Sequence, residues 1–171
     1  MSRVGLIYYT GLFLLLVFLQ VFLFDKIHLF GYATPMLSVY FIIKLPVGDS
    51  HRIANMFLTA LLGLTIDLFG GVLGVNMLAC VLVNFVRPWL LDRFVTEDIH
   101  NNYTPSTYDM GKSLFLQFAF VMVLLHHATV YIVEACSLFD FWGLIFRITG
   151  SVVVTMLLVA AMENFRFDPG K

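Results

Sequence analysis

The stretch LLGLTIDLFGGVLGVNMLACVLVNFV, Leu61 to Val86, decides the fold. It is apolar almost throughout, yet it contains Asp67 and, shortly after it, four residues typical of turns: Gly70, Gly71, Gly74 and Asn76. A carboxylate inside hydrocarbon costs about 2.5 to 3.5 kcal/mol even on lenient insertion scales, so Asp67 should face protein or water. Glycine permits a tight reversal of the chain. The stretch therefore predicts a transmembrane hairpin, with one helix ending near Phe69 and the next beginning near Gly74.

The composition of the whole chain places it among membrane proteins. Of its 171 residues, 60% are hydrophobic and 12% are charged, whereas soluble domains average about 45 to 50% apolar and about 25% charged residues. This length has room for about six helical spans of roughly 20 residues with short connections. The net charge of −1 argues against a nucleic-acid partner. We therefore expect an all-α integral membrane protein, a bundle of six transmembrane helices in a single domain.

Six apolar stretches are expected to form the spans. Their predicted ranges are 4–24, 30–46, 53–69, 74–91, 112–134 and 141–162. The first is too long for the apolar core of a signal peptide, so we expect it to remain as an anchor. The alternation of apolar and charged residues after Pro88 predicts a short amphipathic helix at the interface, over about 88–97. A cytoplasmic loop over 92–111 would follow the fourth span, and its part from Asp98 to Gly111 is hydrophilic.

The second span has the weakest signal. Thr34 and Pro35 suit the start of a helix, because Thr can cap it and Pro fits its first turn. A helix from Pro35 to Leu45 would be only about 16 Å long, however. The segment therefore either begins earlier, near Phe30, or crosses as a broken segment covered by protein. Lys44 is expected to extend its ammonium group to the interface on its long side chain.

The distribution of Lys and Arg predicts that both chain ends are cytoplasmic. With this orientation the inner side receives Arg3, Lys44, Arg52, Arg87, Arg93, Lys112, Arg166 and Lys171. The outer loops receive only Lys26, and Arg147 lies within the sixth span. Cytoplasmic loops carry an excess of basic residues, so the asymmetry favours this orientation. Asp67, Glu134 and Arg147 would then lie in the outer half of the bilayer.

Helical spacing predicts one polar or small face on each of the last four spans. The predicted faces are Ala60, Gly63, Asp67 and Gly70 on the third; Asn76, Cys80 and Asn84 on the fourth; Gln117, Phe120, Leu124, His127, Tyr131 and Glu134 on the fifth; and Arg147, Ser151 and Thr155 on the sixth. These faces should turn inward together. Because an unpaired buried charge is hard to tolerate, we hypothesise that Arg147 neutralises Asp67 or Glu134.

Most of these polar groups have a structural interpretation that outweighs a functional one. Polar stripes in small bundles usually fasten helices together, and we expect this of Asp67 and its glycines ahead of a ligand or partner site. His126 and His127 are neighbours on a helix and point about 100° apart, so they cannot both line one metal site. Cys80 and Cys136 are expected to be free thiols.

Catalytic motifs are absent from the sequence. It has no HExxH, no GxSxG and no P-loop. A membrane aspartyl protease needs two facing carboxylates, but Asp67 is the only Asp well inside a predicted span. We therefore expect no enzymatic activity, no cofactor and no metal.

Two runs of sequence resemble the rod shape-determining MreD family. They are LFGYATPMLSVYFIIKLP, Leu29 to Pro46, and GLTIDLFGGVLGVNMLACVLVNFVRPWLL, Gly63 to Leu91. The similarity lies in a GYxxP segment opening the second span, a G-L-x-x-D-x-F-x-G-x-x-G-x-N core, and RP at the end of the fourth. The chain is also similar to this family in length and in its six hydrophobic stretches.

The resemblance implies a bacterial inner-membrane scaffold of lateral cell-wall elongation. MreD-like proteins associate with the bitopic protein MreC and, through it, with the actin-like MreB, the glycan polymerase RodA and a class B penicillin-binding protein. Their fold is thought to be similar to that of the substrate-binding subunits of energy-coupling factor transporters. An MreC-like helix would bind a lipid-exposed face, and the surface of Gly63, Gly70 and Gly74 is the candidate if it is not used internally.

The shared fold also supplies an alternative, a small-molecule uptake subunit. An outward-facing polar cavity among Asp67, Asn76, Glu134 and Arg147 could hold a vitamin-type ligand. Such subunits typically dock their energising partner through an AxxxA pattern in the first helix. Here that helix reads GLFLLLVFLQVFLF, in which Gly11 stands alone. We therefore favour the scaffold.

Overall fold

The computed structural model describes residues 3–24, 33–48, 51–72, 74–94, 104–135 and 141–165. All regular elements in these ranges are helices, which confirms the all-α class. They are α1 (Arg3–Phe22), α2 (Ser38–Lys44), α3 (Arg52–Gly70), α4 (Val75–Phe94), α5 (Thr107–Met110), α6 (Lys112–Ala135) and α7 (Phe141–Asn164).

Four of these helices are apolar and long enough to span a membrane. They are α3, α4, α6 and α7, each with at least 19 residues. At 1.5 Å per residue such a helix is about 28 Å or longer, close to the thickness of the hydrocarbon core. In addition, α1 is apolar over Ile7–Phe22. The chain is therefore a membrane protein, as its composition predicts.

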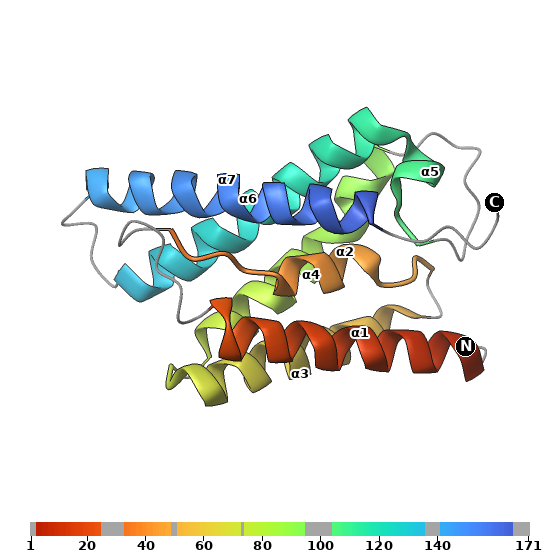
Figure 1. The fold of residues 1–171 in the computed structure, drawn as a ribbon, viewed down its shortest axis with the longest axis horizontal. Helices are drawn as coiled ribbons and strands as arrows, with labels where there is room; N and C mark the ends of the chain where they lie inside the picture. The colour runs from red at the N-terminus through yellow and green to blue at the C-terminus, as the bar shows by residue number, and fades with distance from the viewer. Residues whose placement is uncertain are drawn as a thin grey trace.

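The short helix α2 lies inside the bundle (Figure 1). In this view α1 and α3 lie below it, α7 lies above it, and α4 crosses behind it. Contacts join α2 to α1, α3, α4 and α6. The first residues of α1 and the last residues of α7 lie toward the same end of the bundle. We name this end after Glu163 and the opposite end after Asp67, the buried acidic residues found there.

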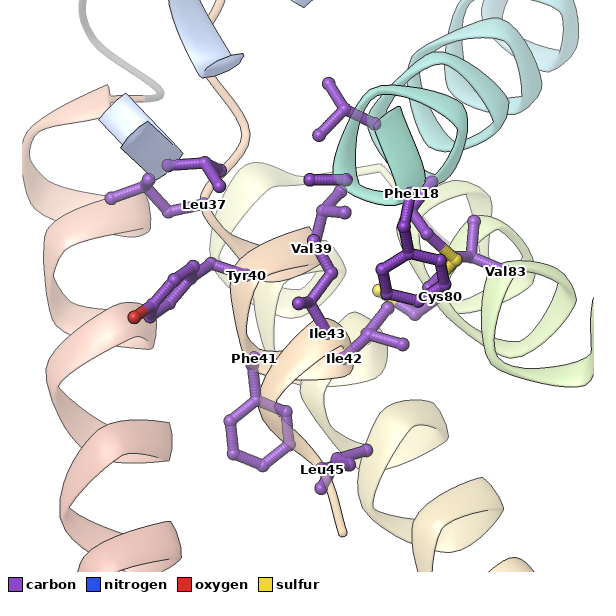
Figure 2. Packing of buried hydrophobic residues seen from close by; sticks show 14 of the residues in the cluster. Leu37, Val39, Tyr40, Phe41, Ile42, Ile43, Leu45, Cys80, Val83 and Phe118 are labelled. Carbon is purple, nitrogen blue, oxygen red and sulfur yellow. The ribbon is translucent and has the colours of Figure 1, made fainter. Parts of the chain in front are cut away.

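Side chains radiate from α2 in all directions into the core. Every residue from Ser38 to Lys44 is buried, and a helix that is buried all round belongs inside a structure. Figure 2 shows Tyr40 pointing toward α1, whereas Cys80 and Phe118 lie on the opposite side of α2. The ring of Phe41 packs edge-on against Phe13 of α1, with their centroids 5.6 Å apart. The larger helices are therefore packed around α2.

Helices α3 and α4 form the hairpin that the glycine-rich turn predicts. Gly71 has a φ of +72° and ends α3 in the left-handed conformation that glycine adopts without strain. Gly63 is buried where α4 crosses α3: a Cβ atom there would lie 2.6 Å from the carbonyl oxygen of Asn76. Only a residue without a side chain lets the two backbones approach this closely.

Two predictions for individual elements are changed by the structure. The second apolar stretch is not one helix over 30–46: within its described part, an extended strip, Ala33 to Met36, precedes the short helix α2. This is the broken, protein-covered alternative. The separate amphipathic helix after Pro88 is wrong, because α4 continues through Pro88 to Phe94. Burial of Leu90 and Leu91 in the core holds this last part of α4 against the bundle.

A substitution at Gly63 tests the close approach of α3 and α4. Gly63→Ala should lower the free energy of unfolding by about 1 to 3 kcal/mol, because its methyl group overlaps the α4 backbone. Thermal unfolding in detergent measures the effect. Gly11→Ala is the matched control, since nothing lies within 4 Å of a Cβ atom at that helical position. Equal melting temperatures for the two variants would contradict the predicted constraint.

Candidate functional site

Asp67 joins the end of α3 to the start of α4. Its side chain is fully buried. Oδ1 accepts hydrogen bonds from the backbone N–H and the Nδ2 of Asn76, both at 2.9 Å. Oδ2 accepts from the backbone N–H groups of Gly74 and Met77, both at 3.0 Å. The carboxylate therefore caps α4, where unpaired N–H groups and the helix dipole stabilise negative charge.

The hypothesised pairing of Asp67 with Arg147 is wrong. Within the described ranges no ion pair reaches Asp67, because four N–H donors already surround its carboxylate. Arg147 is exposed on α7 and Glu134 is exposed near the end of α6. Their charges interact electrostatically, but they also form no ion pair. A counter-ion is unnecessary where backbone dipoles neutralise the buried charge.

The predicted site residues therefore separate into two groups. Asp67, Gly71, Gly74 and Asn76 come together at the α3–α4 turn, and Gly63 lies one turn away beneath α4. Gly70 is exposed at the end of α3, and Glu134 and Arg147 remain on the surface. This arrangement favours a structural role for Asp67.

The predicted helix faces are also only partly correct. Their members that turn inward are Gly63, Asp67, Cys80, Asn84, His127, Tyr131, Ser151 and Thr155. Gln117, Phe120 and Leu124 are exposed instead. The buried face of α6 is centred on Phe118 and Met122, because that side of the helix meets α2 and α4.

A second polar site surrounds the extended strip before α2, and sequence reasoning did not find it. Here three backbone N–H groups donate to side chains of other helices. The pairs are Thr34 N to Ser151 Oγ at 3.0 Å, Met36 N to Thr155 Oγ1 at 3.1 Å, and Leu37 N to Gln20 Oε1 at 2.8 Å. Gln20 also donates from Nε2 to the carbonyl oxygen of Pro35 at 3.2 Å. Side chains of α1 and α7 thus replace the backbone hydrogen bonds that a regular helix would provide.

Side chains of α6 orient two of these acceptors. Tyr131 and Ser151 share a hydrogen bond of 2.8 Å between their hydroxyl groups. Nδ1 of His127 lies 2.9 Å from the carbonyl oxygen of Val123, which can only accept, so Nδ1 carries the proton. Nε2 lies 3.2 Å from the hydroxyl oxygen of Thr155. The same Thr155 oxygen accepts from the Met36 N–H of the strip.

Arg87 supports the other end of α2. Its Nη2 donates to the carbonyl oxygens of Ile43, at 3.3 Å, and of Leu45. Asn55 of α3 donates from Nδ2 to the carbonyl oxygen of Pro46 at 2.8 Å. The last carbonyl groups of a helix have no partner within it, so these donors complete α2 inside the protein.

A buried ion pair joins Lys44, the last residue of α2, to Glu163 near the end of α7. Nζ of Lys44 lies 2.5 Å from Oε2 of Glu163, and both side chains are almost fully buried. Glu163 also accepts from the Tyr40 hydroxyl at 3.2 Å and from the Thr107 N–H at 3.1 Å. Nζ donates to the carbonyl oxygen of Pro105 at 2.9 Å. The ammonium group of Lys44 is therefore buried against Glu163 instead of extending to water.

His126 of α6 contacts residues of α2 and α4. Its Nε2 lies 3.3 Å from Oγ of Ser38 and 3.7 Å from Sγ of Cys80, and all three residues are buried. In the described part of the chain, no group of three or more His, Cys, Asp or Glu side chains could hold a metal ion. Cys80 is a free thiol, as predicted, and Cys136 lies outside the described residues. This contact fastens α2, α4 and α6 together.

No protein-family model, curated protein or solved structure matches this chain. The buried polar side chains described above bind backbone or one another, and they hold the broken segment and the α3–α4 turn. These polar side chains therefore stabilise the fold.

Replacing Asp67 tests its role as a cap. Asp67→Ala should lower the free energy of unfolding by about 3 kcal/mol, because it leaves four N–H groups at the start of α4 without their acceptor. Asp92→Ala removes the same charge from an exposed position of α4 and should change stability by less than about 0.5 kcal/mol. Thermal unfolding of both variants in detergent gives the comparison, and similar losses would contradict the capping role.

A double-mutant cycle tests the Lys44–Glu163 pair. Lys44→Met alone should cost about 3 to 5 kcal/mol, because it leaves a buried carboxylate without its cation. Adding Glu163→Gln should restore part of that loss. Melting temperatures of the wild type, both single variants and the double variant give the coupling energy. Strictly additive effects would show that the two charges are independent.

Proposed function

We propose that this chain is a non-catalytic scaffold of the bacterial cell-wall elongation machinery, similar to the MreD family, and that it binds an MreC-like membrane protein. One observation supports this most directly: the polar residues inside the described bundle are engaged in holding the fold. Such a protein presents a membrane-embedded surface to which other proteins can bind. Through the MreC-like partner it would act indirectly on MreB, RodA and the class B penicillin-binding protein.

The residues that resemble the MreD family have clear structural uses, which supports the proposal. Asp67, Gly74 and Asn76 of the G-L-x-x-D core build the α3–α4 turn. Arg87 of the RP motif holds the end of α2. The resemblance thus coincides with the parts of the sequence that need particular residues, as expected for shared architecture. Six crossings, and a fold like that of energy-coupling factor substrate-binding subunits, belong to this proposal.

The proposed location is the bacterial inner membrane with both chain ends in the cytoplasm. The first residues of α1 and the last of α7 lie toward one end of the bundle, which agrees with an even number of crossings (Figure 1). The distribution of basic residues favours the Glu163 end as the cytoplasmic one, since Arg52, Arg93 and Lys112 belong to it.

Not all of the glycines predicted to form the partner surface are available to a partner. Gly63 is covered by α4 and is not available. Gly70 remains exposed at the Asp67 end of α3. Membrane helices lack a hydrophobic drive to associate and depend on close packing at small residues. We therefore assign the contact with the MreC-like helix to the exposed surface that includes Gly70.

A co-purification experiment tests this contact. Gly70→Leu should reduce recovery of the MreC-like protein from detergent extracts several-fold, while the amount of the variant in the membrane stays the same. Gly11→Leu places the same side chain on an exposed part of α1 and should leave recovery unchanged. If Gly11→Leu alone reduces recovery, the partner surface lies on α1 instead.

Depletion of the protein distinguishes the scaffold from the uptake subunit. A scaffold of wall elongation predicts that depleted cells become round and lyse, whatever vitamins the medium contains. An uptake subunit predicts instead a growth defect that an added vitamin relieves. The second outcome would overturn the proposed function.

A further inference from the structure

An apolar groove lies on the outside of the bundle between the end of α4 and the first half of α6. It is lined by Phe94, Leu116, Gln117, Phe120 and Val121, has a volume of about 410 Å³ and is open on its outer side. A water molecule occupies roughly 30 Å³ in the liquid, so the groove has room for about a dozen groups the size of a methylene. Both helices that form it are long enough to span a membrane, so lipid chains adjoin it.

Two exposed basic residues lie beside the groove, nearer the Glu163 end. Lys112 is the first residue of α6 and lies one helical turn before Leu116, on the same side of the helix. Arg93 directly precedes Phe94 on α4, and its guanidinium lies 5.7 Å from the centre of the Trp89 ring. From Lys112 to Val121, α6 advances by about 13 Å. The charges therefore lie at headgroup depth and the groove extends into the hydrocarbon.

The described acidic residues near this end form no ion pair with Arg93 or Lys112. Asp92 is two positions before Phe94, and its side chain therefore points to nearly the opposite side of α4. Asp109 of α5 accepts a hydrogen bond from the hydroxyl of Ser106, 2.5 Å from Oδ2, and forms no ion pair with Lys112. The partial positive charge at the start of α6 adds to that of Lys112.

We propose that this groove is a binding site for an anionic glycerophospholipid of the surrounding bilayer. One acyl chain lies in the groove, and the phosphate lies between Arg93 and Lys112. The ligand is anionic because basic residues at the membrane surface attract acidic headgroups. It is a lipid because the apolar lining sits directly below the charges, which matches the order of groups in a phospholipid.

The fluorescence of Trp89 provides the test. The chain contains two tryptophans, so Trp142→Phe leaves Trp89, beside Arg93, as the only one. This variant is reconstituted into phosphatidylcholine vesicles that contain an equal fraction of either brominated phosphatidylglycerol or brominated phosphatidylcholine. Bromine quenches a nearby tryptophan, so the ratio of the two quenching constants reports lipid preference. We expect clearly stronger quenching by the phosphatidylglycerol.

Three further variants in the same background identify the source of the preference. Lys112→Gln should lower the ratio by up to roughly fivefold, the effect of one basic residue near an anionic surface. Arg52→Gln removes an exposed charge from the start of α3 and should leave the ratio unchanged. Val121→Phe fills the groove and should also lower the ratio.

Several outcomes would overturn the proposal. Equal quenching by the two lipids would show that the groove does not select an anionic headgroup, and would leave it to a protein segment. Equal effects of Lys112→Gln and Arg52→Gln would indicate general attraction to the bilayer surface. An unchanged ratio in Val121→Phe would show that the groove itself takes no part.

Discussion

Every backbone polar group inside a membrane protein needs a partner, because hydrocarbon provides none. In the described part of the chain this constraint applies to 33–45, where an extended strip and a helix of seven residues lie in the bundle. Too few of its backbone groups can pair within the segment. The rest of the structure supplies the missing partners: Gln20 from α1, Arg87 from α4, and two hydroxyl groups from α7.

The same principle explains where charge is buried. Asp67 is stabilised by the N–H groups of the helix it caps, whereas Lys44 is stabilised by Glu163 and by a backbone carbonyl. These two sites lie at opposite ends of the bundle and fix the α3–α4 turn and the end of α2. These interior polar groups stabilise the fold, so the proposed functions lie on the surface. Gly70 would contact a partner helix, and the groove beside Arg93 and Lys112 would bind a lipid.

The sequence predicted the features that depend on local chemistry. The length of the apolar stretches predicted the long helices, and the glycines predicted the α3–α4 turn. The apolar stretch after Pro35 is short, so a broken second segment, as found in the structure, was one of the two predicted alternatives. Contacts between distant residues were not predictable. A lysine at the end of an apolar run extends to water unless an acid lies nearby, and Glu163 is brought to Lys44 only by folding. Asp67 and Arg147 are opposite charges in apolar stretches, but spacing could not show that the start of α4 supplies Asp67 with donors. Ser151 and Thr155 were expected to face inward, but which backbone groups they bind depends on the path of 33–37.

Hydrogen–deuterium exchange of the protein in lipid nanodiscs tests most directly whether the short segment is a covered centre of the bundle. Amides of Met36, Leu37, Tyr40 and Leu45 in this segment should exchange as slowly as those in the middle of α4 and α6, because their N–H groups are bonded and buried. Exchange within seconds, while the long helices stay protected, would show that this segment is open to water and that the bundle is not built around it.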